Sequence, residues 1–387
     1  MKTQQIYLDN NATTRIAPEA LEAMAPYLED CYGNPSSTHR LGVEARERLV
    51  RARAAVAELI GAKPPEIVFT SGCTESNHLA ILGALALSGR RHIVSSTVEH
   101  PSTLMLLRDL QTQGFKVTFL PVDRDGGLDL GQFERALSSD TALVTLMWAN
   151  NETGVLFPIA RLAAIARSRD ILFHTDAAQA VGRILFDVKT APVDLVSFSG
   201  HKLHAPKGVG GLFVRAGLKW PALLRGHQER RRRGGTENVP AIVALGAACW
   251  LAADSMERDN VRIAKLRDRF ESGILSALRP WVSVNGGKSE RLPNTTNICF
   301  GTVDAEAVLV RLDREGIFAS SGAACSSGGI EPSHVLTAMG LGRASASSSI
   351  RVSLSRYTTE VEIDRVLDAL PAIVRELVAE SSLSAAF

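Results

Sequence analysis

Short apolar segments alternate with helical segments along the first half of the chain, and this alternation restricts the possible folds more than any other feature. Runs rich in Val, Ile and Phe have the length of buried strands, and helical patterns separate them. Such an alternation predicts a mostly parallel sheet flanked by helices, with right-handed connections. The predicted strands are 66–70, 92–97, 116–121, 141–148, 171–175 and 194–198, and the predicted helices are 19–28, 43–60, 79–87, 129–137, 159–169 and one that starts at Ser102.

Polar residues directly follow five of these strands. They are the segment 71–74, His100, Asn151, Asp176 and Lys202. Each has a plainer interpretation when taken alone, because an isolated His is more often structural, a Lys is usually solvated, and Ser or Thr often caps a helix. Ligands of open α/β sheets, however, bind at the carboxyl ends of the strands. The five positions together therefore predict a ligand site along one edge of the sheet.

Lys202 stands at a hairpin-like corner between the apolar runs 194–198 and 209–214. Ser199-Gly200-His201 comes immediately before it, and Asp176-Ala177-Ala178-Gln179 follows the strand upstream. An enzyme that uses pyridoxal 5'-phosphate needs a lysine to form an imine with the cofactor and an acid to pair with its pyridine nitrogen. Lys202 and Asp176 therefore predict a pyridoxal-phosphate site.

The segment 71–77 leads from a strand directly into a helix. Free backbone N–H groups and the positive end of the helix dipole at such a junction favour a bound phosphate. The segment is not a Walker A loop, because its Gly-Lys-Ser/Thr part is missing. We expect phosphate binding here, with simple helix capping by Ser71 and Thr74 as the alternative.

Length and charge limit the class of protein. A chain of 387 residues predicts about two domains. The net charge of +2 gives no indication of a nucleic-acid or membrane partner. The N-terminus lacks the apolar segment of a signal peptide, and the weakly polar stretch 241–253 is shorter than the ~18 residues of a membrane span. Five cysteines without a Cys-x-x-Cys pair favour a reducing cytoplasm and argue against structural zinc.

The second half of the chain predicts a long helix, 241–278, and then a smaller α/β unit with strands 296–300 and 350–356. Within that unit, the segment 320–329 contains only Ser, Gly, Ala and one cysteine, Cys325. A segment of this composition has no core of its own and predicts a mobile loop. Because nothing there would bury the thiol, we expect Cys325 to be a nucleophile.

Two arginine features complete the second half. The run Arg230–Arg233 is typical of a solvated face and occasionally of an RNA-binding patch. It adjoins a Gly-Gly-Thr turn at 234–236 that could contact a phosphate. Arg351 lies within an alternating strand, where its guanidinium is placed to pair with a carboxylate.

Over nearly its whole length the sequence resembles the cysteine desulfurases of the NifS/IscS type, and the extended loop around Cys325 resembles their NifS branch. The segments that carry the resemblance are 8–14, 33–37, 70–77, 99–101, 150–154, 176–179, 199–202, 235–240 and the Cys325 loop.

The resemblance implies an α/β fold of the fold-type-I pyridoxal-phosphate transferases. Its large domain, 16–256, would hold a mostly parallel, seven-stranded sheet flanked by helices. A smaller α/β domain would consist of 1–15 and 257–387 and carry the mobile Cys325 loop. The family is homodimeric, with sites at the subunit interface.

The resemblance also implies a role for each candidate residue. Lys202 would bond covalently to the cofactor, His100 would stack on its ring, and Asp176 would pair with the pyridine nitrogen. Cys325 would complete the catalytic set. The expected binding residues are Asn151 and Gln179 near the ring; Thr74, Ser199, His201 and the Thr236 contributed across the dimer at the phosphate; and Asn34 and Arg351 at the substrate carboxylate. Cys73 is a further expected cofactor-binding residue.

The implied reaction converts L-cysteine to L-alanine in the cytoplasm. Lys202 would move the Cα proton, and Cys325 would take the sulfur as a persulfide, with His100 or the substrate accepting the thiol proton. The persulfide would then pass to an iron–sulfur scaffold or another acceptor, in the NifS branch for nitrogenase maturation. We expect no resident metal, although Cys325 could transiently touch an iron–sulfur cluster, and no nucleic-acid or membrane partner.

Two alternatives stay open at this point. One is a different pyridoxal-phosphate reaction, such as selenocysteine lyase or an aminotransferase-like activity. The other is a protein without the cofactor, either a sulfur or iron–sulfur scaffold or an RNA binder that uses Arg230–Arg233.

The sequence departs from the family pattern at a few positions. Ala205, Arg225, Arg231 and Ser355 stand where the family usually has Gly, and His78 replaces a usual Asn. Replacing Gly is harmless where the backbone φ is negative and costly where it is positive. We therefore expect the arginine-rich segment to depart furthest from the family's geometry.

Overall fold

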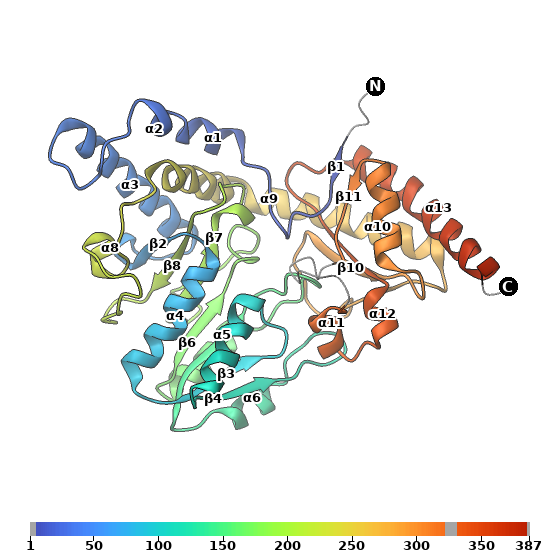
Figure 1. Cartoon of the computed structure of the whole chain (residues 1–387), viewed down its shortest axis with the longest axis horizontal. Coiled ribbons are helices and arrows are strands. Elements are labelled where there is room, and N and C mark those ends of the chain that lie inside the picture. Colours follow the sequence, from blue (N-terminus) through green and yellow to red (C-terminus); the bar gives the residue numbers. More distant parts are fainter. Residues whose placement is uncertain (1–4, 322–330, 385–387) are drawn as a thin grey trace.

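The computed structural model describes residues 5–321 and 331–384. The chain forms a large α/β unit and a smaller one, and the long helix α9 (Val239–Leu278) runs through both (Figure 1).

Seven strands form the sheet of the large unit, in the order β2-β8-β7-β6-β5-β3-β4. They are β2 (Ile67–Thr70), β3 (His92–Ser96), β4 (Lys116–Leu120), β5 (Thr141–Met147), β6 (Leu172–Asp176), β7 (Leu195–Ser199) and β8 (Gly210–Val214). All neighbours pair in parallel except β8, which is antiparallel to both β7 and β2. The predicted mostly parallel, seven-stranded sheet is confirmed, and β2 runs in the same direction as β7. The carboxyl ends of all strands except β8 therefore meet at one edge.

Helices cover both faces of this sheet because successive side chains of each strand point to opposite sides. In β2, Ile67 and Phe69 pack in one core with α3 and α9, whereas Val68 packs in another with α4. The helices of the large unit are α1 (Pro18–Met24), α2 (Pro26–Glu29), α3 (Arg40–Leu59), α4 (Cys73–Ser88), α5 (Pro101–Thr112), α6 (Leu130–Ala136), α7 (Ile159–Ser168) and the short α8 (Gln228–Arg231). Single 3-10 turns occur at Pro64–Glu66 and at Gly200–Lys202.

Two helices differ most from their predicted bounds. The helix predicted over 19–28 is split, because Pro26 lacks an N–H donor and begins a second helix, α2. Helix α4 begins at Cys73 rather than at the predicted Leu79. Its first residues are mostly polar and carry no apolar periodicity, so the sequence pattern did not mark them as helical.

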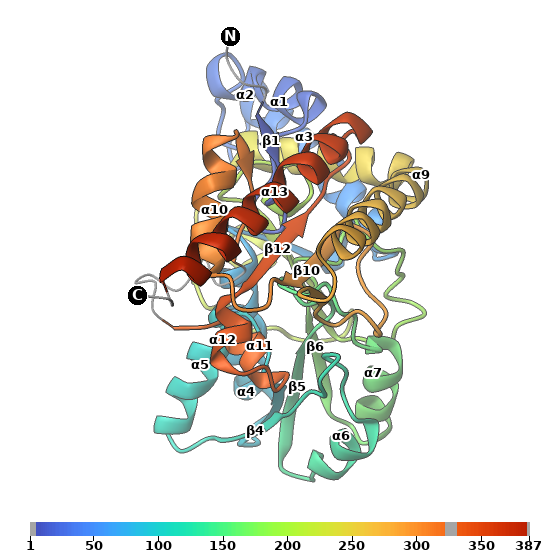
Figure 2. The same ribbon diagram turned by 90° about the vertical axis from the view of Figure 1, so that its right-hand side faces the viewer.

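The small unit contains an antiparallel sheet of β9 (Ser283–Val284), β10 (Thr295–Cys299) and β12 (Ser349–Ser353). Next to it, β1 (Ile6–Tyr7) pairs in parallel with β11 (Ile317–Phe318). Helices α10 (Ala305–Arg314) and α13 (Glu360–Ser384) pack together with these strands (Figure 2). Two short helices, α11 (His334–Ala338) and α12 (Arg343–Ser347), connect back toward the large unit.

The hydrophobic cores show which segments belong together. Ile6 and Leu8 pack in one core with residues of 263–374, so the N-terminal segment joins the small unit. Val335 and Leu336 of α11 instead pack in the core of the large unit. The domain boundaries expected at 16 and 256 remain a prediction.

Helix α9 is, by length and composition alone, apolar enough to cross a membrane. The sequence analysis considered only 241–253 and therefore underestimated its apolar length. Of its most apolar 18-residue window, 56% is buried inside the protein. Its first half packs in the large core and its second half in the small one, as in a core helix.

Candidate active site

A cavity of about 480 Å³ opens at the carboxyl edge of the large sheet. The loops that follow β2, β3, β5, β6 and β7 line it, together with Asn11 to Thr13 and one residue of β12. The convergence predicted from the sequence is confirmed, since the lining includes Cys73, Thr74, His100, Asn151, Asp176, Gln179, Ser199, His201, Lys202 and Arg351.

Lys202 ends the 3-10 turn that follows β7. Its Nζ donates hydrogen bonds to the main-chain carbonyls of Asn11 (2.5 Å) and Ala12 (2.8 Å). The antiparallel pairing of β7 with β8 confirms the hairpin-like corner, and it turns the chain so that Lys202 faces the cavity. These two carbonyl oxygens orient the primary amine.

Asp176 ends the central strand β6, and two residues of α4 fix its carboxylate. Asn77 Nδ2 donates to Oδ2 (2.7 Å), and the Cys73 thiol donates to Oδ1 (3.3 Å). The main-chain N–H of Ala178 also donates to Oδ1 (3.0 Å). Burial, together with the negative charge of Asp176, raises the pKa of the Cys73 thiol well above its usual value. Cys73 is therefore a neutral hydrogen-bond donor rather than a nucleophile.

His100 caps the N-terminus of α5 with its imidazole ring. The main-chain N–H of Ser102 donates to His100 Nδ1 (3.1 Å). Because Nδ1 accepts this bond, Nε2 carries the proton of the neutral ring. Burial lowers the pKa of His100; the charge of Asp176 opposes the shift and that of Lys202 adds to it. The ring is therefore neutral and has its donor nitrogen at Nε2.

The N-terminus of α4 and the turn after β7 form one end of the cavity. The first N–H groups of α4, from Cys73 onward, have no carbonyl partner within the helix. Gly210 allows the close approach of the two segments, because a Cβ there would lie 2.7 Å from the Cα of Gly72. Burial and the charge of Lys202 lower the pKa of His201 to about 4, so the imidazole is neutral.

This donor set fits pyridoxal 5'-phosphate. The cavity combines an amine, a carboxylate for the pyridine nitrogen, and a helix N-terminus beside Ser199 and Thr74 for the phosphate. The sequence predicted the chemical types, and the structure places them around one space.

Arg351 of β12 is almost fully buried and closes the opposite side of the cavity. One terminal nitrogen is 2.6 Å from the carboxylate of Asp9, and the other donates to the main-chain carbonyl of Asn151 (3.0 Å). Its Nε has no hydrogen-bond partner among the residues that the structure describes. A buried donor without a partner is unfavourable and favours a bound anion.

Gln179 lines the cavity, and both the nitrogen and the oxygen of its side-chain amide form hydrogen bonds. Its Nε2 donates to the main-chain carbonyl of Asn11 (3.0 Å), and its Oε1 accepts a bond from Arg183. Arg183 was not predicted as a site residue. It lies in the turn region after β6, where no periodicity in the sequence marks its contact with Gln179.

Three predicted site residues lie elsewhere or outside the described chain. Asn34 is exposed and does not line the cavity, because its side-chain oxygen accepts the N–H of Ser36 within its own turn. Thr236 lines a neighbouring cavity of about 220 Å³. Cys325 lies outside the residues that the structure describes. Their roles remain predictions.

Sequence reasoning also missed Asn11 and Asn77 as individual residues. Both lie within segments that carry the family resemblance, but neither was assigned a role. Asn11 holds Lys202 through its carbonyl, and Asn77 orients Asp176. Such supporting contacts depend on tertiary packing, and no spacing in the sequence marks them.

Comparison with known proteins agrees with this site. The family model described as aminotransferase class-V matches residues 6–366. A cysteine desulfurase of Trichormus azollae is 51% identical over 374 residues, which cover 96% of this chain and 93% of that protein. The cysteine desulfurase NifS of Azotobacter vinelandii is 49% identical over 375 residues, with 96% and 93% covered. The solved structure of a NifS-like protein superposes with a TM-score of 0.89 at 35% identity, covering 96% of this chain and all of that one.

The matches extend over the whole fold and include every segment that lines the cavity. Families of this fold depend on pyridoxal 5'-phosphate, in agreement with the donor set. The chain is therefore an enzyme of the class-V aminotransferase family and belongs to its cysteine desulfurases, the group that includes NifS.

Proposed function

We propose that the chain holds pyridoxal 5'-phosphate on Lys202 and removes the sulfur of L-cysteine, giving L-alanine and a persulfide on Cys325. The observation that carries this proposal is the single cavity that joins Lys202 and Asp176 to the N-terminus of α4 and to Arg351. These groups match the amine, acid, phosphate site and carboxylate anchor that the reaction requires.

The residues of the cavity have separate roles in binding the cofactor and the substrate. Lys202 forms the covalent bond, Asp176 faces the pyridine nitrogen, and the N-terminus of α4 with Ser199 holds the phosphate. When bound, the cofactor supplies an electron-withdrawing ring that acidifies the Cα proton of the substrate. The unpartnered Nε of Arg351 is available to the substrate carboxylate, with Asn34 as a second expected anchor.

The chain's own groups then move protons and sulfur. Lys202, released as a free amine, takes the proton from the substrate Cα and returns it to a carbon atom of the bound cofactor. The Cys325 thiolate attacks the substrate sulfur, so that an S–S bond forms while the bond between sulfur and Cβ breaks. The electron pair of that bond stays with the carbon skeleton, which takes up a proton and leaves as L-alanine.

Ionisation of Cys325 requires a base, because an ordinary cysteine with a pKa of ~8.5 is only a few per cent thiolate at pH 7. Neutral His100 has its proton on Nε2, and its Nδ1 accepts the bond from Ser102. We therefore favour the substrate itself as the acceptor, with His100 as a hydrogen-bond donor.

Transfer of the persulfide sulfur to an acceptor protein is the last step of the proposed reaction. We infer from the likeness to NifS that the persulfide passes to an iron–sulfur scaffold or another acceptor protein in the cytoplasm, with nitrogenase maturation as the specific case. We also infer a homodimer in which the partner contributes Thr236 to the phosphate site. Thr236 lines a neighbouring cavity rather than the active-site cavity of its own chain, which favours this arrangement. A transient contact of Cys325 with a cluster is part of the same proposal.

Replacement of the nucleophile tests the proposed reaction. Cys325→Ala should keep the visible absorption of the bound cofactor but form no persulfide and lose sulfur transfer by at least about 100-fold. Cys31→Ala is a suitable control, because Cys31 is partly exposed and lies outside the cavity. The readouts are alanine, sulfide and protein-bound persulfide after addition of L-cysteine and a thiol reductant.

Normal sulfide release by Cys325→Ala would refute the assignment of the nucleophile. Selenocysteine lyase activity without cysteine turnover would point to a different reaction on the same cofactor. A protein that stays colourless with pyridoxal 5'-phosphate would reject the cofactor site itself.

A further inference from the structure

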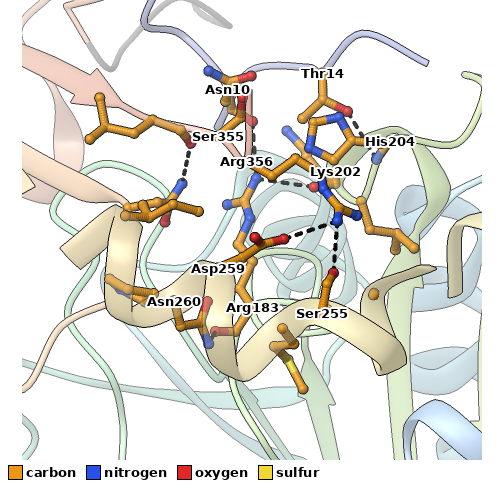
Figure 3. A pocket seen from close by; sticks show the side chains of 18 of the residues that line it. Asn10, Thr14, Arg183, Lys202, His204, Ser255, Asp259, Asn260, Ser355 and Arg356 are labelled. Atoms are coloured by element: carbon orange, nitrogen blue, oxygen red, sulfur yellow. Dashed lines mark hydrogen bonds and ion pairs between the residues drawn. The ribbon is translucent and has the colours of Figure 1, made fainter. Parts of the chain in front are cut away.

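Arg183 and Lys202 both line a second cavity (Figure 3), and Arg183 does not line the active-site cavity. One terminal nitrogen donates to the main-chain carbonyls of Asn10 (3.0 Å) and Lys202 (3.1 Å). The other donates to the side-chain oxygens of Asn11 (2.7 Å) and Gln179. Every acceptor of this guanidinium is therefore a neutral oxygen.

The positive charge of Arg183 is not balanced by a nearby carboxylate. Within residues 5–321 and 331–384, Arg183 forms no ion pair. Asp259, which lines the same cavity, pairs with Arg356 (3.0 Å), and Asp9 pairs with Arg351 (2.6 Å). Desolvation, with a smaller contribution from the charge of Arg351, lowers the pKa of Arg183 to about 10. Arg183 therefore remains a cation at neutral pH.

One residue, Asn11, connects this cation with the reactive amine. Its side-chain oxygen accepts a bond from Arg183, and its main-chain oxygen accepts the bond from Lys202 Nζ. The guanidinium also binds the carbonyl of Lys202 itself. Arg183 and the Lys202 amine thus bind the same residue, Asn11, in a desolvated region, where a like charge disfavours protonation of its neighbour.

We propose that Arg183 is a positioning residue that favours the deprotonated, reactive form of the Lys202 amine and of its bond to the cofactor. This inference rests on the proposed role of Lys202 as the lysine that binds the cofactor. Arg183 also fixes the amide of Gln179, because donation to Oε1 leaves Nε2 as the end that donates.

Other charged and titratable groups face Lys202 from the surrounding elements. They are Cys73 and Glu75 in the first turn of α4, His100 at the start of α5, Asp176 at the end of β6, His201 and Lys207 in the turn between β7 and β8, and Arg351 of β12. All of them remain unchanged when Arg183 alone is replaced. A comparison of variants at residue 183 therefore isolates the contribution of this one charge.

A pH titration of the visible absorption of the full-length holoenzyme tests the inference. This absorption changes with protonation of the bond between Lys202 and the cofactor. Arg183→Met removes the charge, so the midpoint should move to higher pH by on the order of one unit. Arg183→Lys keeps the charge, and its midpoint should stay close to that of the wild type.

Arg262→Met is the matched control. Arg262 also donates to two main-chain carbonyls, those of Thr358 (2.7 Å) and Arg356 (2.6 Å), but it lies outside the cavity. Its loss should lower stability without moving the midpoint. Arg183→Gln serves as a second neutral variant if Arg183→Met does not fold.

The outcomes distinguish an effect of the Arg183 charge on Lys202 from a purely structural role of Arg183. An unmoved midpoint in a folded neutral variant, or equal shifts in Arg183→Lys and Arg183→Met, would overturn the inference. Failure of both neutral variants to fold, with Arg183→Lys intact, would show a structural role instead and would overturn it as well. A colourless wild-type protein would reject the cofactor site itself, whereas a coloured wild type with unmoved variants would reject only the role of Arg183.

Discussion

At the scale of single residues, Asp176 depends on its charge for its proposed role and on two neighbours in α4 for its orientation. Asp176→Asn keeps the shape but removes the negative charge that would hold the pyridine nitrogen protonated. We expect kcat to fall by at least about 100-fold while the cofactor stays attached to Lys202. Steady-state rates and the visible spectrum of the same preparation measure the two effects separately.

Asn77→Ala provides a graded comparison, because it keeps the charge of Asp176 and removes the 2.7 Å bond that orients it. A hydrogen bond to a charged group contributes ~1.5–3 kcal/mol, so we expect kcat to fall by about 10- to 150-fold. Activity of Asp176→Asn near that of the wild type would contradict the proposed role of the carboxylate.

The residues of the site that could be predicted from the sequence are those at the ends of strands. Once strands and helices alternate, topology alone brings Asp176, His100 and Lys202 to one edge, whatever their side-chain contacts. The supporting contacts could not be predicted in this way. Asn11 lies far from Lys202 in the sequence and reaches it only through packing of the N-terminal segment. Asn34 stays in its own turn, so a motif match alone did not bring it to the cavity.

At the scale of elements, the arginine-rich turn at α8 carries the most unusual backbone. Glu229, Arg230 and Arg231 have φ values of 46°, 56° and 63°, three left-handed residues in succession. A network around Glu229 holds this conformation. Its carboxylate binds both terminal nitrogens of Arg53 (2.6 and 2.7 Å) and the main-chain N–H of Phe69 (2.9 Å). The strained turn is therefore tied to β2, beside the N-terminus of α4.

Arg231→Gly should relieve part of this strain. Glycine adopts positive φ without the clash that Cβ causes, so we expect the protein to gain about 1 kcal/mol of stability. Arg232 has φ −97°, and Arg232→Gly should instead destabilise by ~0.5–1 kcal/mol through loss of backbone restriction. Chemical denaturation of both variants measures the difference, and equal effects at the two positions would show that φ is not the cause.

The same turn explains why the departures from the family pattern could not be ranked from the sequence. Four positions have a side chain where the family usually has Gly, but only Arg231 has a positive φ. Ala205, Arg225 and Ser355 lie outside the left-handed region, so a Cβ is tolerated there. Backbone angles follow from the surrounding packing, and no residue type in the segment indicates them.

At the scale of the whole molecule, helix α9 contributes to both hydrophobic cores, and short segments of the chain pack in the core of the other unit. The N-terminal strand β1 joins the small unit, and α11 packs on the large one. Periodicity predicted the individual helices and strands well, because each buries one face. It could not predict these exchanges, since a short apolar segment such as Ile6–Leu8 fits either core until tertiary packing selects one.

Buried titratable groups of the large sheet make the stability of the whole molecule depend on pH. Burial raises the pKa of Glu99 to about 8, so the folded state holds a proton that the unfolded chain releases, and stability falls as pH rises from about 4.5 to 8. His174 acts in the opposite direction. Burial lowers its pKa to about 4, and its ring nitrogens are 2.8 Å from the hydroxyls of Thr145 and Ser197.

His174 should therefore make the protein sensitive to acid. Between pH 6.5 and about 4 the unfolded chain binds a proton that folded His174 does not bind. The free energy of unfolding therefore decreases as the pH is lowered through this range, by up to about 3 kcal/mol. His174→Asn keeps one hydrogen bond and cannot titrate. We expect a lower Tm than the wild type at pH 7.5 and a difference that shrinks toward pH 4.5, because only the wild type loses this contribution. Exposed His227→Asn is the control, and thermal unfolding followed by circular dichroism at each pH is the measurement. A Tm difference that stays constant with pH would show that His174 is not the group responsible.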